Sequence, residues 1–208
     1  MQWVATLPAV AAGFVQVRVP DPNGPPLEAG IWYPSEASSS ARGLGLYTQT
    51  VAVGGEVAGR SLPLVVLSHG TGGSFQQHYD TALALAEAGF VVAAITHTGD
   101  NYQDQSASLF VRAGFENRLR HIKALIDYML LSWPQHDRLN STRIGIFGFS
   151  AGGFTALVAI GGVPDLSVGR SHCAAYSDDW GCRTAREKGV QLSGPRLPSF
   201  MTLVSPQR

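Results

Sequence analysis

The sequence has few charged residues, no long apolar run and only two cysteines. Each of these features argues against a particular class of protein or site. Charged residues make up 14% of the chain, well below the roughly 25% usual for soluble domains. Fifteen basic residues balance fifteen acidic ones, so no basic excess indicates a nucleic-acid partner and no charge block indicates a disordered tail. No apolar run reaches the roughly 18 residues of a membrane span, and we expect no transmembrane segment.

The two cysteines, Cys173 and Cys182, have a spacing that argues against a metal or redox site. A redox pair would need C-x-x-C, and a zinc site would need pairs of closely spaced cysteines. The eight residues between them suit a loop-closing disulfide in an oxidising compartment. Two reduced, buried thiols are the alternative, and the sequence leaves both open. We expect no metal site.

The opening segment leaves the compartment undecided. Residues 9–12, AVAA, resemble a signal cleavage site. The segment lacks a basic start, however, and Pro8 interrupts its short apolar run. Cytoplasmic, periplasmic and secreted locations all remain open.

The order of predicted elements indicates an α/β fold with a mostly parallel sheet. Residues 13–21 alternate with period two, and residues 27–34 can return antiparallel to them. Residues 35–60 are rich in Ser and Gly and are expected to form a surface excursion. Three apolar runs typical of buried strands then alternate with helical patterns. The strands are expected at 62–70, 90–97 and 143–149, and the helices at 75–88, 115–133 and 150–162.

The segment GFSAG, residues 148–152, matches the G-x-S-x-G motif in the context that gives the motif meaning. A strand is predicted before it and a small-residue helix after it, so Ser150 would occupy a strained strand-to-helix turn. Such a turn exposes the serine Oγ, and the helix N-terminus favours developing negative charge. Ser150 is therefore the candidate nucleophile, and a tight structural turn is the alternative.

The segment LSHGTGGS, residues 67–74, follows the first buried strand and predicts an oxyanion loop. The backbone N–H groups of Thr71 and Ala151 are the candidate donors. His69 is a pocket candidate and is expected to shape the loop rather than act as the base. His97 and Asp100 follow the second buried strand at the edge where ligands bind and are pocket candidates. A hydrogen-bonded loop is the alternative for this pair.

These segments resemble a known family. LPLVVLSHGTGGS, AGFVVAAITHTGDN and GIFGFSAGG are similar to α/β-hydrolases of the platelet-activating-factor-acetylhydrolase-like and predicted dienelactone hydrolase group. HCAAYSDDWGC resembles a cysteine-bearing insertion that some bacterial members carry. The resemblance runs from about residue 13 to about residue 189. It implies one α/β-hydrolase domain over residues 1–208, with the insertion-like segment at about 164–190.

The resemblance also implies a serine esterase mechanism with a Ser–Asp–His triad, a small-molecule ester substrate and no cofactor. Dienelactone hydrolases themselves use a cysteine nucleophile, whereas this motif carries Ser150. The acid and the histidine of such a triad follow the serine in the chain. The acidic and histidine residues after Ser150 that could serve are Asp165, His172, Asp178, Asp179 and Glu187.

None of these residues fits the expected triad order well. No histidine follows His172, so the family's last strands and its triad histidine are expected to be absent. The remaining open edge of the sheet would favour self-association. Two alternatives stay open: a non-catalytic homologue that binds an ester-like ligand, and an unusual triad of His172 with Asp178 or Asp179. His78, His121 and His136 are expected to be surface residues.

Overall fold

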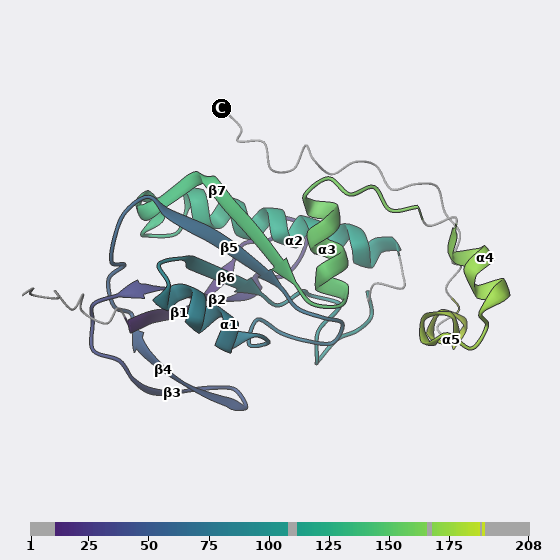
Figure 1. Cartoon of the computed structure of the whole chain (residues 1–208), viewed down its shortest axis with the longest axis horizontal. Coiled ribbons are helices and arrows are strands. Elements are labelled where there is room, and N and C mark those ends of the chain that lie inside the picture. The colour runs from purple at the N-terminus through teal and green to yellow at the C-terminus, as the bar shows by residue number, and fades with distance from the viewer. Residues whose placement is uncertain (1–10, 108–111, 166–167, 188, 190–208) are drawn as a thin grey trace, which may run out of the picture.

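A seven-stranded sheet forms the centre of the molecule in the computed structural model, which describes residues 11–107, 112–165, 168–187 and 189 (Figure 1). Its order is β3-β4-β1-β2-β6-β5-β7. The strands are β1 (Ala11–Val19), β2 (Leu27–Ser35), β3 (Ser40–Leu44), β4 (Tyr47–Val53), β5 (Leu62–Ser68), β6 (Val91–Ile95) and β7 (Leu139–Gly148). The helices are α1 (Tyr79–Glu87), α2 (Arg112–Leu131), α3 (Ala151–Ala159), α4 (Val168–Ala175) and α5 (Trp180–Glu187), with a 3-10 turn at His136–Arg138.

The part of the sheet that carries the site is parallel. β5 pairs in parallel with β6 on one side and with β7 on the other. β1 and β2 form the predicted antiparallel pair, and β2 joins β6 antiparallel. Because β5, β6 and β7 run the same way, the loops after their carboxyl ends meet at one edge of the sheet.

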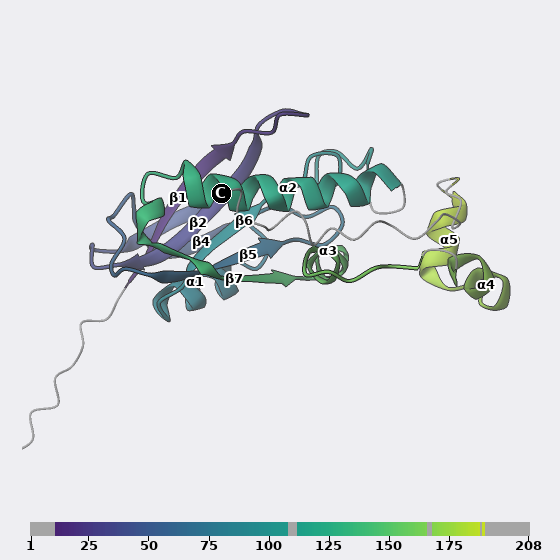
Figure 2. The same cartoon turned by 90° about the horizontal axis from the view of Figure 1, so that it is seen from above.

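Helices cover both faces of the sheet, as its two apolar sides require. Ile122, Leu125 and Met129 of α2 are buried against one face. Ala82 and Ala86 of α1 are buried against the other, and Figure 2 shows the two helices on opposite sides. β6 is buried along its whole length, as expected of a strand between two helix layers. Among the described residues, no helix has the length and apolar character needed to cross a membrane.

α1 begins later than the sequence pattern suggested. Residues 75–78 form turns, and the Phe75 side chain is buried in the α1 core while its N–H donates to Thr96 Oγ1 at 2.9 Å. The helix ends at Glu87, within one residue of the predicted end at residue 88. Gly89 has φ +93° and donates its N–H to the Ala86 carbonyl, which is the geometry of a C-terminal glycine.

Residues 35–60 were expected to form a surface excursion, and this expectation was wrong: the segment contributes two strands to the sheet. β3 and β4 lie within this segment as an antiparallel pair, and β4 extends the sheet in parallel beside β1. Val51 and Ala52 of β4 are buried, as is Leu44 of β3. The Ser and Gly content of the segment did not indicate strands. The position of β4 depends on its pairing with β1, which is remote in the sequence.

β7 was expected to be buried on both faces, and the structure corrects this. Its residues are exposed or half-buried, because no strand lies beyond it in the described part of the chain. Phe147 is 38% exposed, Leu157 of the adjoining α3 is 63% exposed, and Ile160, just after α3, is 65% exposed. β7 is therefore an open, apolar edge among the described residues.

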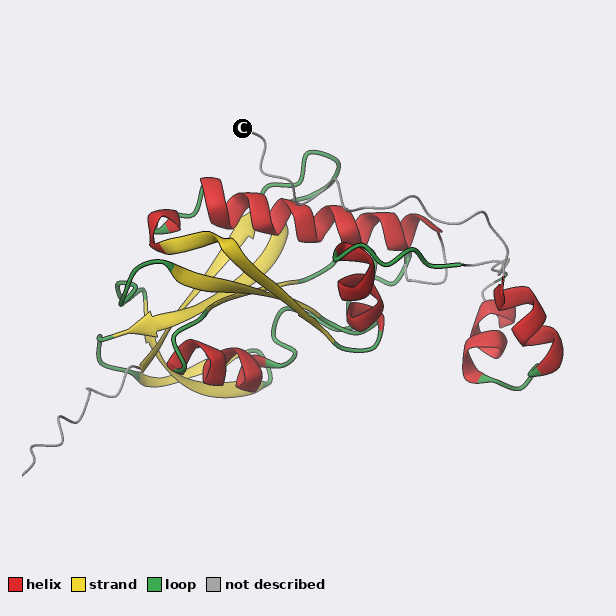
Figure 3. Ribbon diagram, turned by 45° about the horizontal axis from the view of Figure 1, so that its top comes forward, coloured by secondary structure: helices red, strands yellow, loops and turns green. Residues whose placement is uncertain are grey.

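The insertion-like segment forms two short helices beyond the carboxyl end of β7. Figure 3 shows α4 and α5 beside each other and set apart from the sheet. A disulfide joins Cys173 of α4 to Cys182 of α5, with the Cα atoms 5.4 Å apart, a usual separation for such a bond. Cys182 is buried between the helices although most of their surface is exposed.

We expect the disulfide to hold α4 and α5 together. In the chain-entropy model, closing so short a loop stabilises its folded form by about 2–3 kcal/mol. Protein made under oxidising conditions should show an intact mass without reductant that corresponds to no free thiol. The double variant Cys173→Ser/Cys182→Ser should be cleaved faster by protease within residues 168–187 than the parent. Two titratable thiols in the parent protein would contradict the pairing.

Candidate active site

Ser150 lies at the turn between β7 and α3, with a backbone geometry that few residues adopt. Its φ is +52° and its ψ is −115°, an uncommon and strained conformation for a residue with a side chain. β7 ends at Gly148, and α3 begins at Ala151. The Ser150 residue is exposed. The predicted strand–turn–helix setting is therefore present.

Close backbone contacts explain the glycines of the motif. A Cβ on Gly152 would lie 1.8 Å from the Ser68 carbonyl oxygen of β5. A Cβ on Gly148 would lie 2.0 Å from the Gly152 carbonyl oxygen. Both separations are far below van der Waals contact, so only glycine lets the turn approach β5 this closely.

A cavity of about 300 Å³ opens in front of Ser150. Four parts of the chain form its walls: the loop after β5, the loop after β6, the turn that carries Ser150, and α5. The residues that line it are Gly70, Thr71, Gln77, Gln105, Phe149, Ser150, Trp180 and Thr184. Thr71 and Ser150, which the sequence placed in one site, thus face the same cavity.

The loop after β5 has one uncommitted N–H among three successive amides. Gly70 donates its N–H to Gln77 Oε1 at 3.1 Å, and Gly72 donates to Asp100 Oδ1 at 3.2 Å. The Thr71 N–H between them has no acceptor among the described residues. The Ala151 N–H is the first of α3 and has no intrahelical acceptor by its position.

Both ring nitrogens of His69 are engaged in the loop. Nε2 accepts the His97 backbone N–H at 3.0 Å, so the ring proton is on Nδ1. Nδ1 then donates to the Gly70 carbonyl at 2.6 Å. Burial, followed by the charge of Arg118, lowers the pKa of His69 to about 3. His69 therefore shapes the loop, as expected, and has no nitrogen available to accept a proton from Ser150.

His97 and Asp100, the other pocket candidates, are buried beneath the loop rather than on the walls of the Ser150 cavity. His97 Nε2 lies 2.9 Å from Ser68 Oγ, and its Nδ1 lies 3.2 Å from Nδ1 of His121. Asp100 binds Arg118, with 2.9 Å between Oδ2 and Nε. The structure thus places both in a hydrogen-bonded network, which was the alternative interpretation of this pair.

The sequence reading missed two buried members of this network, Arg118 and His121. His121 was expected at the surface, but it is fully buried and lies 3.5 Å from Asp21. His136, by contrast, is exposed, and His78 is half-buried. The helical spacing of the sequence could have predicted that Arg118 and His121 are buried. Arg118 precedes Ile122 by four residues, and His121 precedes Leu125 by four, which places both on the apolar face of α2.

The buried histidines predict that the fold loses stability in mild acid. Burial is the main cause that lowers the pKa of His69 to about 3 and of His121 to about 4, and it holds that of His97 well below 6.5. These rings stay neutral in the folded chain but gain a proton near pH 6.5 when it unfolds. Stability is therefore complete above pH 6.5 and falls as the pH drops toward 4. Each ring contributes a loss of about 1.4 kcal/mol per pH unit.

Urea unfolding at pH 7.5 and pH 5.0 tests this expectation. The midpoint should fall clearly at the lower pH, and His121→Asn should reduce the difference between the two. His136→Gln is the matched control, because His136 is exposed and its ring bonds to the Trp133 carbonyl rather than to a carboxylate. It should leave the difference unchanged. Equal midpoints at both values of pH would show that the buried rings do not control stability.

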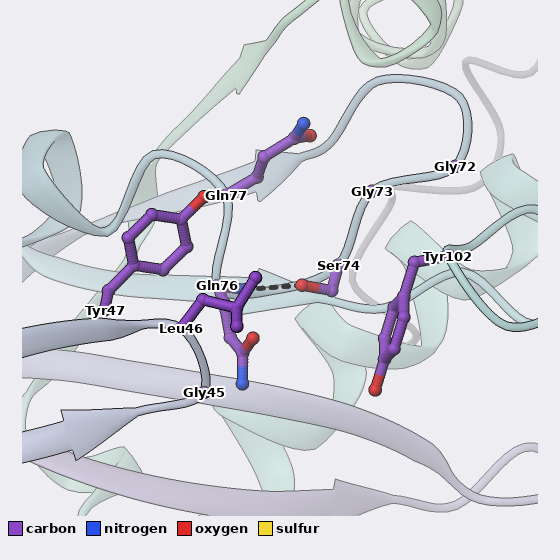
Figure 4. A pocket seen from close by; sticks show the side chains of 9 residues that line it. All are labelled: Gly45, Leu46, Tyr47, Gly72, Gly73, Ser74, Gln76, Gln77 and Tyr102. Carbon is purple, nitrogen blue, oxygen red and sulfur yellow. Dashed lines mark hydrogen bonds between the residues drawn. The ribbon is translucent and has the colours of Figure 1, made fainter.

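A second cavity of about 340 Å³ lies beside the same loop. Figure 4 shows Tyr47 and Tyr102 on opposite sides, with Leu46 and Gln76 between them. The two cavities share Gln77. The lining residues are Gly45, Leu46, Tyr47, Gly72, Gly73, Ser74, Gln76, Gln77 and Tyr102.

Among the candidate triad partners after Ser150, His172 and Asp179 are brought together. His172 Nε2 lies 2.9 Å from Asp179 Oδ2, and both side chains are about half exposed. The hydrogen bond from His172 lowers the pKa of Asp179, with a smaller effect from the Gly181 N–H. No hydrogen bond joins Ser150 to a histidine in the described part of the chain.

The remaining candidates lie elsewhere. Asp165 follows α3, Asp178 accepts a hydrogen bond from Ser177, and Glu187 is the last residue of α5. Within the residues described, no group of three or more His, Cys, Asp or Glu side chains is arranged to hold a metal ion.

Comparison with known proteins found one family match and several structures of similar fold. Residues 43–117 match the family described as platelet-activating factor acetylhydrolase, isoform II. No curated protein matches the sequence. A ferulic acid esterase from Streptomyces cinnamoneus superposes with a TM-score of 0.57 at 23% identity, covering 75% of this chain and 56% of that one.

A dienelactone hydrolase-like promiscuous phosphotriesterase from metagenomic libraries has a similar fold. Its TM-score is 0.50 at 18% identity, with 71% of this chain and 53% of that one covered. The chain thus spans little more than half the length of these two structures. The predicted fold, a mostly parallel sheet flanked by helices as in α/β-hydrolases, is confirmed.

Proposed function

We propose that this chain, which has the fold of the α/β-hydrolases and whose residues 43–117 match the family of platelet-activating factor acetylhydrolase, isoform II, attacks carboxylic esters through Ser150. The observation that carries the proposal is the arrangement of Ser150 with two uncommitted N–H groups. Ser150 and Thr71 face one cavity, and the Ala151 N–H begins the helix behind the serine. A nucleophile beside two such donors is the arrangement that acyl transfer needs.

The chemistry follows from these groups. Ser150 Oγ attacks the ester carbonyl carbon, and the carbonyl electrons move to its oxygen. The N–H groups of Thr71 and Ala151 stabilise the negative charge that develops there. The C–O bond to the alcohol then breaks, the alcohol leaves with a proton, and an acyl-enzyme remains on Ser150 for water to cleave.

A phosphonylating probe tests the proposal directly. If a fluorophosphonate modifies any residue, it should modify Ser150, because among the described residues this serine combines the strained turn with the two donors. Peptide mapping after the reaction identifies the modified residue. Labelling at another serine would contradict the assignment.

A second candidate function is binding of an ester-like ligand without turnover. It is favoured by the absence, among the described residues, of a histidine bonded to Ser150. Without a base, the serine hydroxyl keeps its proton at neutral pH and attacks slowly. Both candidates use the same cavity and differ in turnover.

The second cavity supports a role in recognition of the ester. Since the two cavities share Gln77, a substrate held at Ser150 can extend past this side chain. Tyr47 and Tyr102 offer ring faces there, and the Gln76 amide offers a donor and an acceptor. Such a lining suits a flat ring that carries hydroxyl groups.

A further inference from the structure

Arg118 lies directly beneath the loop that carries Thr71. Its side chain is 1% exposed, and so is that of its ion-pair partner Asp100. Nε donates to Asp100 Oδ2 at 2.9 Å. Nη1 donates to the His69 carbonyl at 2.9 Å and to Ser68 Oγ at 3.2 Å, and Nη2 donates to the Gly70 carbonyl at 3.3 Å.

These hydrogen bonds determine which way the loop amides face. A trans peptide unit is planar, and its C=O and N–H point in opposite directions. Because the His69 carbonyl points down to Arg118, the following Gly70 N–H points away, where it meets Gln77. The Gly70 carbonyl also accepts from Arg118 Nη2 at 3.3 Å, together with His69 Nδ1 at 2.6 Å and the Gly73 N–H at 3.1 Å. The Thr71 N–H therefore points away from the guanidinium, and Thr71 lines the Ser150 cavity.

Asp100, the ion-pair partner of Arg118, also holds the Gly72 amide. Asp100 accepts the guanidinium through Oδ2 and the Gly72 N–H through Oδ1. The N–H groups on either side of Thr71 are thus occupied, and the Thr71 N–H remains uncommitted. We propose that Arg118 is the positioning residue of the oxyanion hole, holding two loop carbonyls so that the Thr71 N–H faces Ser150. This inference rests on the proposed function.

The guanidinium shape is essential to this role. Arginine presents several N–H donors in a rigid fork, whereas a lysine ammonium is a compact point charge. The fork reaches the carboxylate with Nε and the two successive carbonyls with Nη1 and Nη2. A lysine at this position would retain the charge beside Asp100 but could not hold both carbonyls in the same geometry.

A Ser150→Cys background allows the oxyanion hole to be measured without a histidine base. At pH 9 most of the introduced thiol is thiolate. It is the one free thiol, because both native cysteines are joined in the disulfide. Acylation by p-nitrophenyl acetate forms an oxyanion and reports on Thr71. Alkylation by iodoacetamide forms no oxyanion and reports only on access to the thiol.

In this background, Arg118→Met should slow acylation about 100-fold, the effect of losing one oxyanion donor. The alkylation rate should stay within about two-fold, because the turn at residue 150 is held by β5 and α3 rather than by Arg118. Arg118→Lys should fall between Arg118→Met and the parent. Arg120→Met is the matched control: it lies two residues along α2, is 26% exposed and pairs with Asp21. It should change neither rate.

The two reactions separate the outcomes. Unchanged acylation in folded Arg118→Met would overturn the proposal, and so would an equal fall in acylation and alkylation, because that reports general damage to the turn. If Arg118→Met does not fold, Arg118→Lys and the double variant Arg118→Met/Asp100→Asn are judged by the same two rates. The proposed function fails differently: the Ser150→Cys parent itself would then acylate no faster than a small free thiol of similar pKa.

Discussion

Ser150→Ala is expected to abolish covalent labelling by a fluorophosphonate completely. The strained turn leaves the Ser150 residue exposed in the cavity, and the variant removes the atom that would bond to phosphorus. The fold should survive the change, since no hydrogen bond of the Ser150 hydroxyl is found in the described part of the chain. Intact mass and peptide mapping measure the result.

Ser74→Ala is the matched control for this experiment. Ser74 lies in the same loop region and lines the second cavity, where its Oγ accepts the Gln76 N–H at 3.3 Å. It has neither the strained turn nor a helix N-terminus behind it, so labelling should continue at the parent rate. Persistent labelling of Ser150→Ala would identify another nucleophile and reject the assignment.

Local patterns in the sequence predicted the parts of the fold that local forces determine. The run at 62–68 has the β-branched, apolar character of an interior strand, and β5 lies between β6 and β7. The turn at Ser150 was predictable because close backbone contacts allow only glycine at positions 148 and 152. β4 was not predictable in this way, since its place depends on pairing with β1, remote in the sequence.

The polar network under the loop shows a second limit of the sequence. Helical spacing places Arg118 and His121 on the buried face of α2, but it does not say which groups they bind. Their partners come from loops after β1, β5 and β6, including Asp21, His69 and Asp100. Only the folded sheet brings these loops together at one edge. The role of Thr71 was inferred from its motif, whereas the orientation of its N–H required the structure.

The final expectation concerns turnover: this 208-residue chain should hydrolyse p-nitrophenyl acetate only slowly at pH 7. Among the described residues, no histidine is bonded to Ser150, and His69 has both nitrogens engaged. Loss of a triad histidine costs on the order of 10⁶ in rate. The donors and the cavity alone leave an acceleration of about 10³–10⁴ over water.

His172 provides the critical comparison for this expectation, because it already has the carboxylate partner that a catalytic histidine requires. It binds Asp179, and the next residue, Trp180, lines the Ser150 cavity. If His172 takes no part, His172→Gln should match the parent in acylation and turnover, while Ser150→Ala loses both. Rapid hydrolysis that depends on Ser150 and falls at least about 10³-fold in His172→Gln would overturn the expectation. The same result would identify His172 and Asp179 as the base and its partner.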